Sequence, residues 1–170
     1  MVAAFIFFLF MLSIFFLPLR TALIFYEKDT GELEAYLPRE TGSKFDLVFT
    51  HSIHHTDVTE KYSITANMQI EQYEIIFEQF GIGMPSNSGE GETFTYEDGV
   101  YHIKDLNNRF EEIKLRNGKT VSENRLGWEA HSGEYKMVWL NDYFAPGAML
   151  TLRVEKMTLW DMMKGVKIDE

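Results

Sequence analysis

The segment from Phe45 to Ala66 alternates apolar and polar side chains over two consecutive stretches, which is the pattern of a β-hairpin. Successive side chains of a strand point to opposite faces, so each stretch has one mainly apolar face. In the first stretch this face consists of Phe45, Leu47, Phe49, His51 and Ile53. In the second stretch it consists of Val58, Glu60, Tyr62, Ile64 and Ala66. A chain organised around such a hairpin is expected to fold as an antiparallel β-domain.

The two polar members of these apolar faces are His51 and Glu60. A turn at His54–Asp57 places Ile53 opposite Val58 and His51 opposite Glu60, with Cβ atoms about 5 Å apart. A histidine held by a carboxylate can accept a proton or anchor a ligand. The same pair can also be structural, because a buried polar pair fixes the register of a hairpin. Both interpretations remain open from the residues alone.

Composition restricts the class of protein. The chain has 170 residues, which is enough for one domain with a core, and it has no cysteine, which excludes disulfides and thiolate metal sites. Its formal net charge is −10, and all 16 lysines and arginines lie at or after Arg20. An acidic domain without basic clusters argues against binding to nucleic acid.

The N-terminal segment is uncharged from residue 1 to residue 19, and the apolar run continues to Tyr26. About 20 apolar residues cross a bilayer as a helix, so we predict a single transmembrane helix, with residues 1–26 as a membrane anchor. A cleaved signal peptide is the alternative. Arg20 and Lys28 follow the segment, and by the positive-inside rule this would leave the domain in the cytoplasm.

Residues 27–170 are predicted to form one all-β domain, an antiparallel sandwich or barrel built from hairpins. Turn signals occur at Asp29-Thr30-Gly31, Asp98-Gly99 and Asn117-Gly118. The last of these predicts a hairpin between residues 109–116 and 119–121. Residues 69–80 fit a strand or a helix, and their neighbours favour a strand. The remaining expectations are irregular structure at 122–134, closing strands at 135–140 and 148–156, and a short helix at 158–164.

Other arrangements that suggest chemistry are weak. His51 and His54 would face opposite sides of a strand and His55 lies in the turn, so we predict no metal site. Ser52 points away from its neighbour His51, which excludes a nucleophile–base pair between them, and we expect no enzyme. Gly81-Ile82-Gly83 lacks the third glycine of a nucleotide-binding fingerprint. We predict no cofactor there, and two interpretations of the glycines remain: a tight turn, or backbone close to a ligand or partner.

Three motifs together resemble a family of small bacterial proteins of uncharacterised function. They are Phe49-Thr50-His51-Ser52-Ile53, then Val58 and Glu60-x-Tyr62, then Phe80-Gly81-Ile82-Gly83-Met84-Pro85. The resemblance covers about residues 22–100. This sequence departs from the family pattern at Ile82, where alanine is usual, and at His54-His55. Members of the family are typically encoded beside the fused membrane permease of TAXI-type TRAP transporters, which import organic acids.

The resemblance implies an extracytoplasmic domain, against the charge rule, and an accessory role in TRAP-type uptake through contact with the permease or its substrate-binding protein. The candidate contact residues are His51, Ser52, Glu60, Gly81, Gly83 and Pro85. The competing function is a stand-alone small-ligand binding domain with a pocket around His51 and Glu60.

Overall fold

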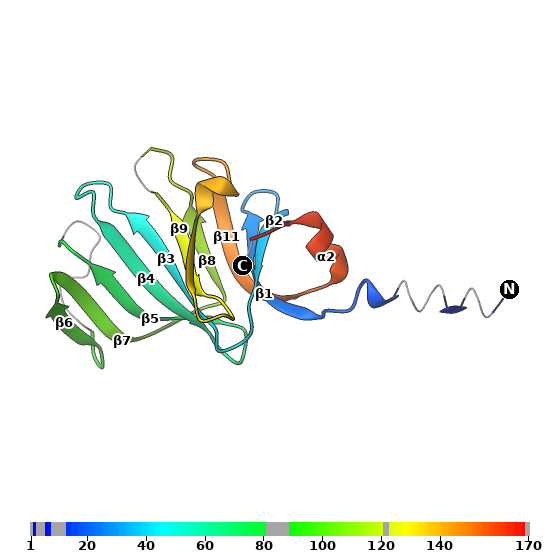
Figure 1. Ribbon diagram of the computed structural model, residues 1–170, viewed down its shortest axis with the longest axis horizontal. Coiled ribbons are helices and arrows are strands. Elements are labelled where there is room, and N and C mark those ends of the chain that lie inside the picture. The colour runs from blue at the N-terminus through cyan, green and yellow to red at the C-terminus, as the bar shows by residue number, and fades with distance from the viewer. Residues whose placement is uncertain (1, 3–5, 8–12, 81–88, 121–122, 169–170) are drawn as a thin grey trace.

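The structure, a computed structural model, describes residues 2, 6–7, 13–80, 89–120 and 123–168. Its described strands form two separate sheets, so the all-β domain is a sandwich rather than a barrel (Figure 1). The five-stranded sheet has the order β12 (Val166–Lys167), β2 (Leu33–Pro38), β1 (Arg20–Glu27), β11 (Met149–Met157) and β8 (Glu112–Arg116). The seven-stranded sheet has the order β10 (Tyr135–Trp139), β9 (Arg125–Glu129), β3 (Lys44–Thr50), β4 (Asp57–Ile64), β5 (Ile70–Phe77), β7 (Val100–Phe110) and β6 (Thr93–Glu97). Neighbouring strands are antiparallel except β12 and β2.

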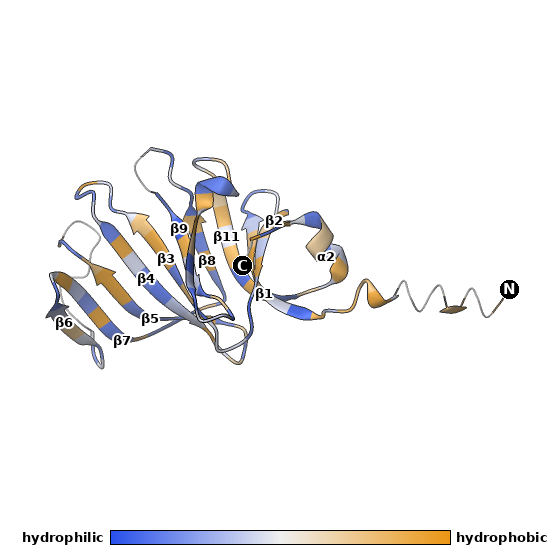
Figure 2. Cartoon of the chain, in the orientation of Figure 1, coloured by the Kyte–Doolittle hydropathy of each residue, from blue (hydrophilic) through white to orange (hydrophobic). Residues whose placement is uncertain are grey.

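The main core lies between the two sheets and follows from the alternation along each strand. Figure 2 shows apolar and polar residues alternating along β3 and β4. The cluster takes inward side chains from both sheets, including Leu23, Phe25, Leu152, Phe45 and Trp128. Burial of such side chains is the dominant favourable term in folding.

Strand β1 is buried on both faces, which explains its unbroken apolar sequence. Leu23 and Phe25 point into the main core, whereas Ala22 and Ile24 pack with Met162 on the outer face of the sheet. The boundary of the domain therefore lies before Arg20, and residues 20–26, grouped with the anchor from the sequence, form a strand of the sandwich.

The outer face of β1 is covered by the short helix α2 (Leu159–Lys164), which the sequence predicted. Thr158 and Asp161 form a capping box, in which each side chain accepts a hydrogen bond from the backbone N–H of the other residue. The chain then returns to pair β12 with β2.

The predicted register of the main hairpin is wrong. Leu47, not His51, lies opposite Glu60, and strand pairing ends at Thr50 and Asp57. The Thr50 hydroxyl donates to the Asp57 carboxylate at 3.0 Å, and residues 51–56 form a loop in which His55 has φ +56°. The observed and predicted registers keep every side chain on the same face, so alternation alone cannot distinguish them.

Other hairpin predictions have mixed outcomes. Residues 70–77 form a strand, and the turn at Asp98-Gly99 pairs Tyr96 with Tyr101, as predicted. The prediction of a hairpin at Asn117-Gly118 is wrong, because β8 pairs with β11. The chain passes from the seven-stranded to the five-stranded sheet near Glu111, between β7 and β8.

Strand β9 lies within 122–134, where irregular structure was predicted. Its centre is Gly127, where a Cβ atom would collide with the Tyr135 hydroxyl. A glycine in the middle of a strand weakens the sequence pattern but permits this close approach.

The described part of the N-terminal segment does not join the core. Among the described residues, no helix has the length and apolar character needed to cross a bilayer. Predicted anchor residues 1, 3–5 and 8–12 lie outside the described part of the chain. Most of the described apolar side chains before β1 are exposed, for example Phe7 at 62% and Phe16 at 58%, and Ile14 is half-buried.

Candidate functional site

His51 lies in the loop after β3, where its side chain organises the backbone. Its Nδ1 atom accepts hydrogen bonds from the backbone N–H groups of Ile53 and His54, at 3.3 and 3.4 Å, and its ring stacks on that of His54. The backbone N–H of His51 also donates to the Thr56 carbonyl at 2.8 Å. Ser52 is exposed beside it. The structure thus gives His51 a role in shaping the loop.

Glu60 lies on the inner face of β4. It pairs with Leu47, four residues before His51, its predicted partner. It lines a cavity of about 250 Å³ between the sheets with Leu47, Phe49, Leu115 and Leu140 among its neighbours. The Tyr62 hydroxyl donates to its carboxylate at 2.8 Å. Burial raises the pKa of Glu60, and the hydrogen bond from Tyr62 opposes this rise without cancelling it.

Replacing Glu60 with glutamine should change the melting temperature more favourably at neutral pH than at pH 4. Because folding raises the pKa of Glu60, the folded protein holds a proton that the unfolded chain loses in the interval between the two pKa values. The contribution of Glu60 to stability is therefore greatest below the unfolded pKa and falls as pH rises through the folded pKa. Glutamine carries no charge and still accepts from Tyr62, so the variant should lack this loss. Melting curves between pH 4 and 8 measure the difference.

Glu74 provides the matched control with the opposite sign. Burial pushes its pKa upward, but hydrogen bonds and charges from His102 and Lys61 outweigh burial and hold the pKa below its usual range. Its contribution is present above the unfolded pKa and is lost as pH falls through the folded pKa. Glu74→Gln should therefore destabilise more at pH 7 than at pH 4. Parallel pH dependences for the two variants would contradict the environment assigned to Glu60.

Gly81, Gly83 and Pro85 lie outside the described residues, so the structure leaves their predicted role untested. The segment that precedes them ends in an aromatic cluster. Phe80 packs on Phe94 and Tyr101, with centroids 5.9 and 4.3 Å apart, and Tyr101 also contacts Phe77 and Tyr96. We call these five residues the aromatic wing. Its rings extend an apolar cluster of β4, β5 and β7 that is separate from the main core.

The outer face of the seven-stranded sheet carries a polar network that sequence reasoning missed. The Glu74 carboxylate lies 2.8 Å from His102 Nδ1 and 3.1 Å from Lys61 Nζ. On the neighbouring strands, the Tyr135 hydroxyl donates to the Asp46 carboxylate at 2.7 Å. The participants come from β3, β4, β5, β7 and β10, so pairing of the strands is required to bring them together. Each of these polar side chains therefore has a structural role in hydrogen bonds or ion pairs between strands.

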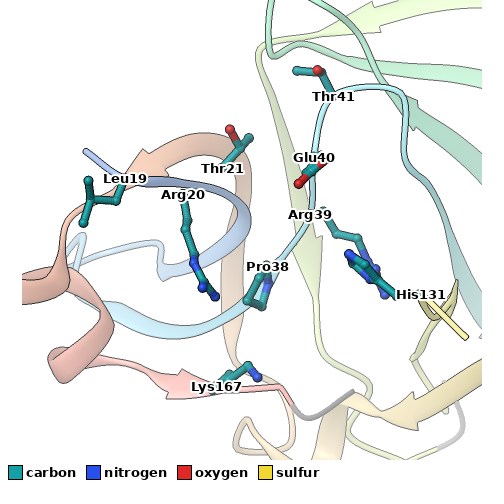
Figure 3. Close-up of a pocket in the computed structure, with 9 residues that line it drawn as sticks. All are labelled: Leu19, Arg20, Thr21, Pro38, Arg39, Glu40, Thr41, His131 and Lys167. Carbon is teal, nitrogen blue, oxygen red and sulfur yellow. The ribbon is translucent and has the colours of Figure 1, made fainter. Parts of the chain in front are cut away.

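A second cavity, of about 540 Å³, was also missed. It lies where β1 begins and β2 ends, beside β12 and the turn between β9 and β10 (Figure 3). Its described lining consists of Leu19, Arg20, Thr21, Pro38, Arg39, Glu40, Thr41, His131 and Lys167. We call this the basic cavity. No local motif could have revealed it, because its charged residues come from opposite ends of the sequence.

The described residues contain no group of three or more histidine, aspartate or glutamate side chains placed to hold a metal ion. His51 and His54 share one loop, whereas His102 lies on a distant strand and His131 in another turn. His102 is instead held by Glu74.

Together these features define a two-sheet, antiparallel all-β protein with a charged cavity at one end and an aromatic surface on its larger sheet. The chain belongs to the family described as Domain of unknown function (DUF1850), which matches residues 45–137. The matched residues run from β3 into β10 and include β4 to β9. Searches of the curated proteins and of the solved structures each found no match.

Proposed function

We propose that the protein is a membrane-anchored, extracytoplasmic accessory protein of a TRAP-type uptake system for organic anions, and that it acts by contact with another protein. The observation that carries the contact role is the aromatic wing, which combines exposed rings with an edge strand. The link to TRAP-type uptake, and with it the extracytoplasmic location, rests on the resemblance of residues 22–100.

Attachment to a membrane is supported by the apolar surface near the start of the chain. Residues 1–19 have no charged side chain, and most of the described apolar side chains among them are exposed. This surface continues onto α2, where Phe16 contacts Trp160 with centroids 6.4 Å apart and Met163 is 69% exposed. Tryptophan is enriched where a protein meets the headgroup region of a bilayer. We therefore propose one N-terminal transmembrane helix, with α2 at the membrane end of the domain.

The aromatic wing lies at the opposite end of the long axis from the N-terminal segment (Figure 1). Tyr96 is 61% exposed and Phe80 42% exposed, and β6 is the last strand of its sheet. Exposed aromatic residues are typical anchors of protein interfaces, and an edge strand can pair with a strand of a partner. Because the wing lies away from the membrane end, the soluble substrate-binding protein suits it better as partner than the permease does.

The proposed location predicts cleavage of the domain by a protease added outside the cell. In spheroplasts, or in intact cells if the host has a single membrane, an antibody against the domain should detect loss of the full-length chain. The protein should also fractionate with membranes. A cytoplasmic protein serves as the control for cell integrity. Protection until lysis would contradict the extracytoplasmic assignment.

The proposed contact predicts that Tyr96→Ser combined with Phe80→Ser reduces co-purification with the substrate-binding protein and slows uptake of the transported acid. Each change removes an exposed ring that packs on Tyr101. Trp139→Ser is the matched control, because Trp139 is 43% exposed and lies at the other edge of the same sheet. Equal co-purification and uptake for both variants, with folding retained, would contradict a contact through the wing.

A stand-alone ligand-binding domain is the second candidate, and the cavity beside Glu60 favours it. A pocket was expected around both His51 and Glu60. Of these two residues, the described lining of the cavity includes Glu60 but not His51. Under this alternative, deletion of the gene leaves the kinetics of TRAP-type uptake unchanged. Under the accessory role, deletion slows uptake.

A further inference from the structure

The cavity that Glu60 lines, here called the Glu60 cavity, lies on the same face of the seven-stranded sheet as the aromatic wing. Strand pairing aligns Glu60 with Leu47 on β3 and with Ile75 on β5. The same row continues through Ile103 on β7 to Phe94 on β6, which is one of the rings of the wing. Residues paired directly across a sheet share a face. An apolar row therefore runs from the Glu60 cavity to the wing, with Glu60 as its charged member.

Glu60 presents an unused hydrogen-bond acceptor to this cavity. The Tyr62 hydroxyl donates to Oε2 at 2.8 Å, and it is the one side-chain partner that the described part of the chain gives the Glu60 carboxylate. The other oxygen, Oε1, is not among the buried polar atoms that lack a partner, so it remains open to solvent. The walls around the carboxylate are apolar and consist of Leu47, Phe49, Ile113, Leu115 and Leu140. In such surroundings a hydrogen bond to Oε1 is strengthened, because little water competes for it.

The size of the cavity restricts its occupant. Its volume of about 250 Å³ lies below the range of about 300–1,000 Å³ that is usual for small-molecule sites. The cavity suits one large side chain instead. Protein interfaces commonly place one such side chain of a partner in a pocket near a cluster of aromatic contacts, and tyrosine is among the side chains enriched there. The continuity of the cavity with the wing matches this arrangement.

The charges around the cavity favour a neutral donor over an ammonium group. Its described lining includes Lys114 and Arg125, each paired with a carboxylate, and the exposed Arg116. These cations oppose the entry of another cation. An ammonium group would also lose its water in a mainly apolar cavity, and a buried ion pair often fails to recover that cost. A neutral hydroxyl loses less on burial and still donates to Glu60.

We propose that the Glu60 cavity receives the side chain of a tyrosine from the protein that binds the aromatic wing, with the phenol hydroxyl donating to Glu60 and the ring lying against the apolar walls. Tyrosine combines a large apolar body with one neutral donor at its tip. The identity of the occupant as part of a protein rests on the proposed contact function. The chemistry of the cavity does not, because it follows from the lining alone.

The first test measures the chemistry of the cavity without a partner. The full chain in uncharged determined micelles of one detergent, with its isoleucine and leucine methyl groups labelled, is titrated by NMR with N-acetyl-tyrosinamide, N-acetyl-phenylalaninamide and N-acetyl-lysinamide. The methyl signals of Ile113, Leu115 and Leu140 report on the cavity because these residues line it. They should shift saturably with the tyrosine probe, which should bind about threefold or more tightly than the phenylalanine probe, because only the former donates to Glu60. The lysine probe should bind most weakly.

Variants of Glu60 locate the hydrogen bond. Glu60→Leu removes the acceptor, so the affinity for the tyrosine probe should fall to that for the phenylalanine probe. Glu60→Gln keeps an acceptor and should retain the affinity for the tyrosine probe within about twofold. Glu71→Leu is the matched control, because Glu71 is paired with Arg109 at 2.6 Å and does not line the cavity. In co-purification with the substrate-binding protein, Glu60→Leu should reduce recovery of the partner, whereas Glu60→Gln and Glu71→Leu should not.

Three results would overturn the proposal. The first is the absence of saturable shifts at the cavity up to about 30 mM of the tyrosine probe. The second is binding of the phenylalanine or lysine probe at least as tight as that of the tyrosine probe. The third is full co-purification of a folded Glu60→Leu variant where the wing variant loses its partner. Each of these leaves the contact through the wing standing. If the tyrosine probe binds as expected but the unaltered chain co-purifies with no partner, the contact function and the protein occupant fail together, and the cavity belongs to the second candidate function.

Discussion

Replacing Trp128 with alanine should lower the free energy of unfolding by about 3–5 kcal/mol, as is typical for truncation of a buried large aromatic side chain. Trp128 is 1% exposed and packs in the core between the sheets, opposite Phe45 on the neighbouring strand. Truncation removes these contacts and leaves a cavity that the surrounding strands cannot fully close. For a chain of this size the melting temperature should fall by about 6–20 °C. Urea and thermal unfolding measure both quantities.

Two further variants separate the loss of packing from other effects. Trp139→Ala removes the same side chain from the neighbouring strand, where it is 43% exposed and stacked by Arg125, and should cost about 1 kcal/mol or less. Trp128→Phe keeps a buried ring and removes an indole N–H that finds no hydrogen-bond partner among the described residues, so it should cost much less than alanine. A similar loss for Trp128→Ala and Trp139→Ala would contradict the position of Trp128 in the core.

Trp128 also connects the core to the basic cavity, because the Arg39 guanidinium lies over its ring. A change in the core at this position should therefore disturb the orientation of Arg39. Trp128→Phe preserves an aromatic face under the guanidinium, whereas Trp128→Ala removes it. Trp128 lies on β9, the strand that was not predicted from the sequence because Gly127 interrupts its pattern.

The strands could largely be predicted from the sequence, but their register could not. Alternation identifies which side chains of β3 and β4 face inward, and this assignment is correct. Moving the hairpin by an even number of residues preserves those faces, so the pattern cannot distinguish Leu47 from His51 as the partner of Glu60. Register is set instead by the loop that His51 organises and by pairing of β3 with β9.

Side chains brought together by topology were beyond local pattern analysis. Arg20 and Lys167 reach one cavity because β1 and β12 both flank β2, at opposite ends of the chain. Asn117 had the sequence of a hairpin turn because Asn-Gly is a common turn pair. In the structure it is fully buried, since the chain has just changed sheets and must be tied to the segment around η1 (Leu140–Asp142).

Replacing Asn117 with alanine should lower the free energy of unfolding by about 2–4 kcal/mol, and the melting temperature by about 4–16 °C. Its side-chain Nδ2 lies 2.9 Å from the Asn141 side-chain oxygen and 3.2 and 3.1 Å from the carbonyls of Phe144 and Ala145. Alanine removes the donor and leaves one buried acceptor, the Phe144 carbonyl, and two part-buried acceptors without it. Each buried polar group left unsatisfied costs about 1–3 kcal/mol.

Asn124→Ala is the matched control, since Asn124 donates one hydrogen bond to the Arg116 carbonyl at 2.7 Å in an exposed setting where water can replace it. It should cost about 1 kcal/mol or less. Asn117→Asp provides a further comparison, because an ionised carboxylate of nearly the same shape cannot donate to the three oxygens. It should destabilise at pH 7 at least as much as alanine does, and recover in part at acidic pH, where the protonated carboxyl regains one donor. Equal losses for Asn117→Ala and Asn124→Ala would mean that the buried hydrogen bonds do not hold β8 to the segment around η1.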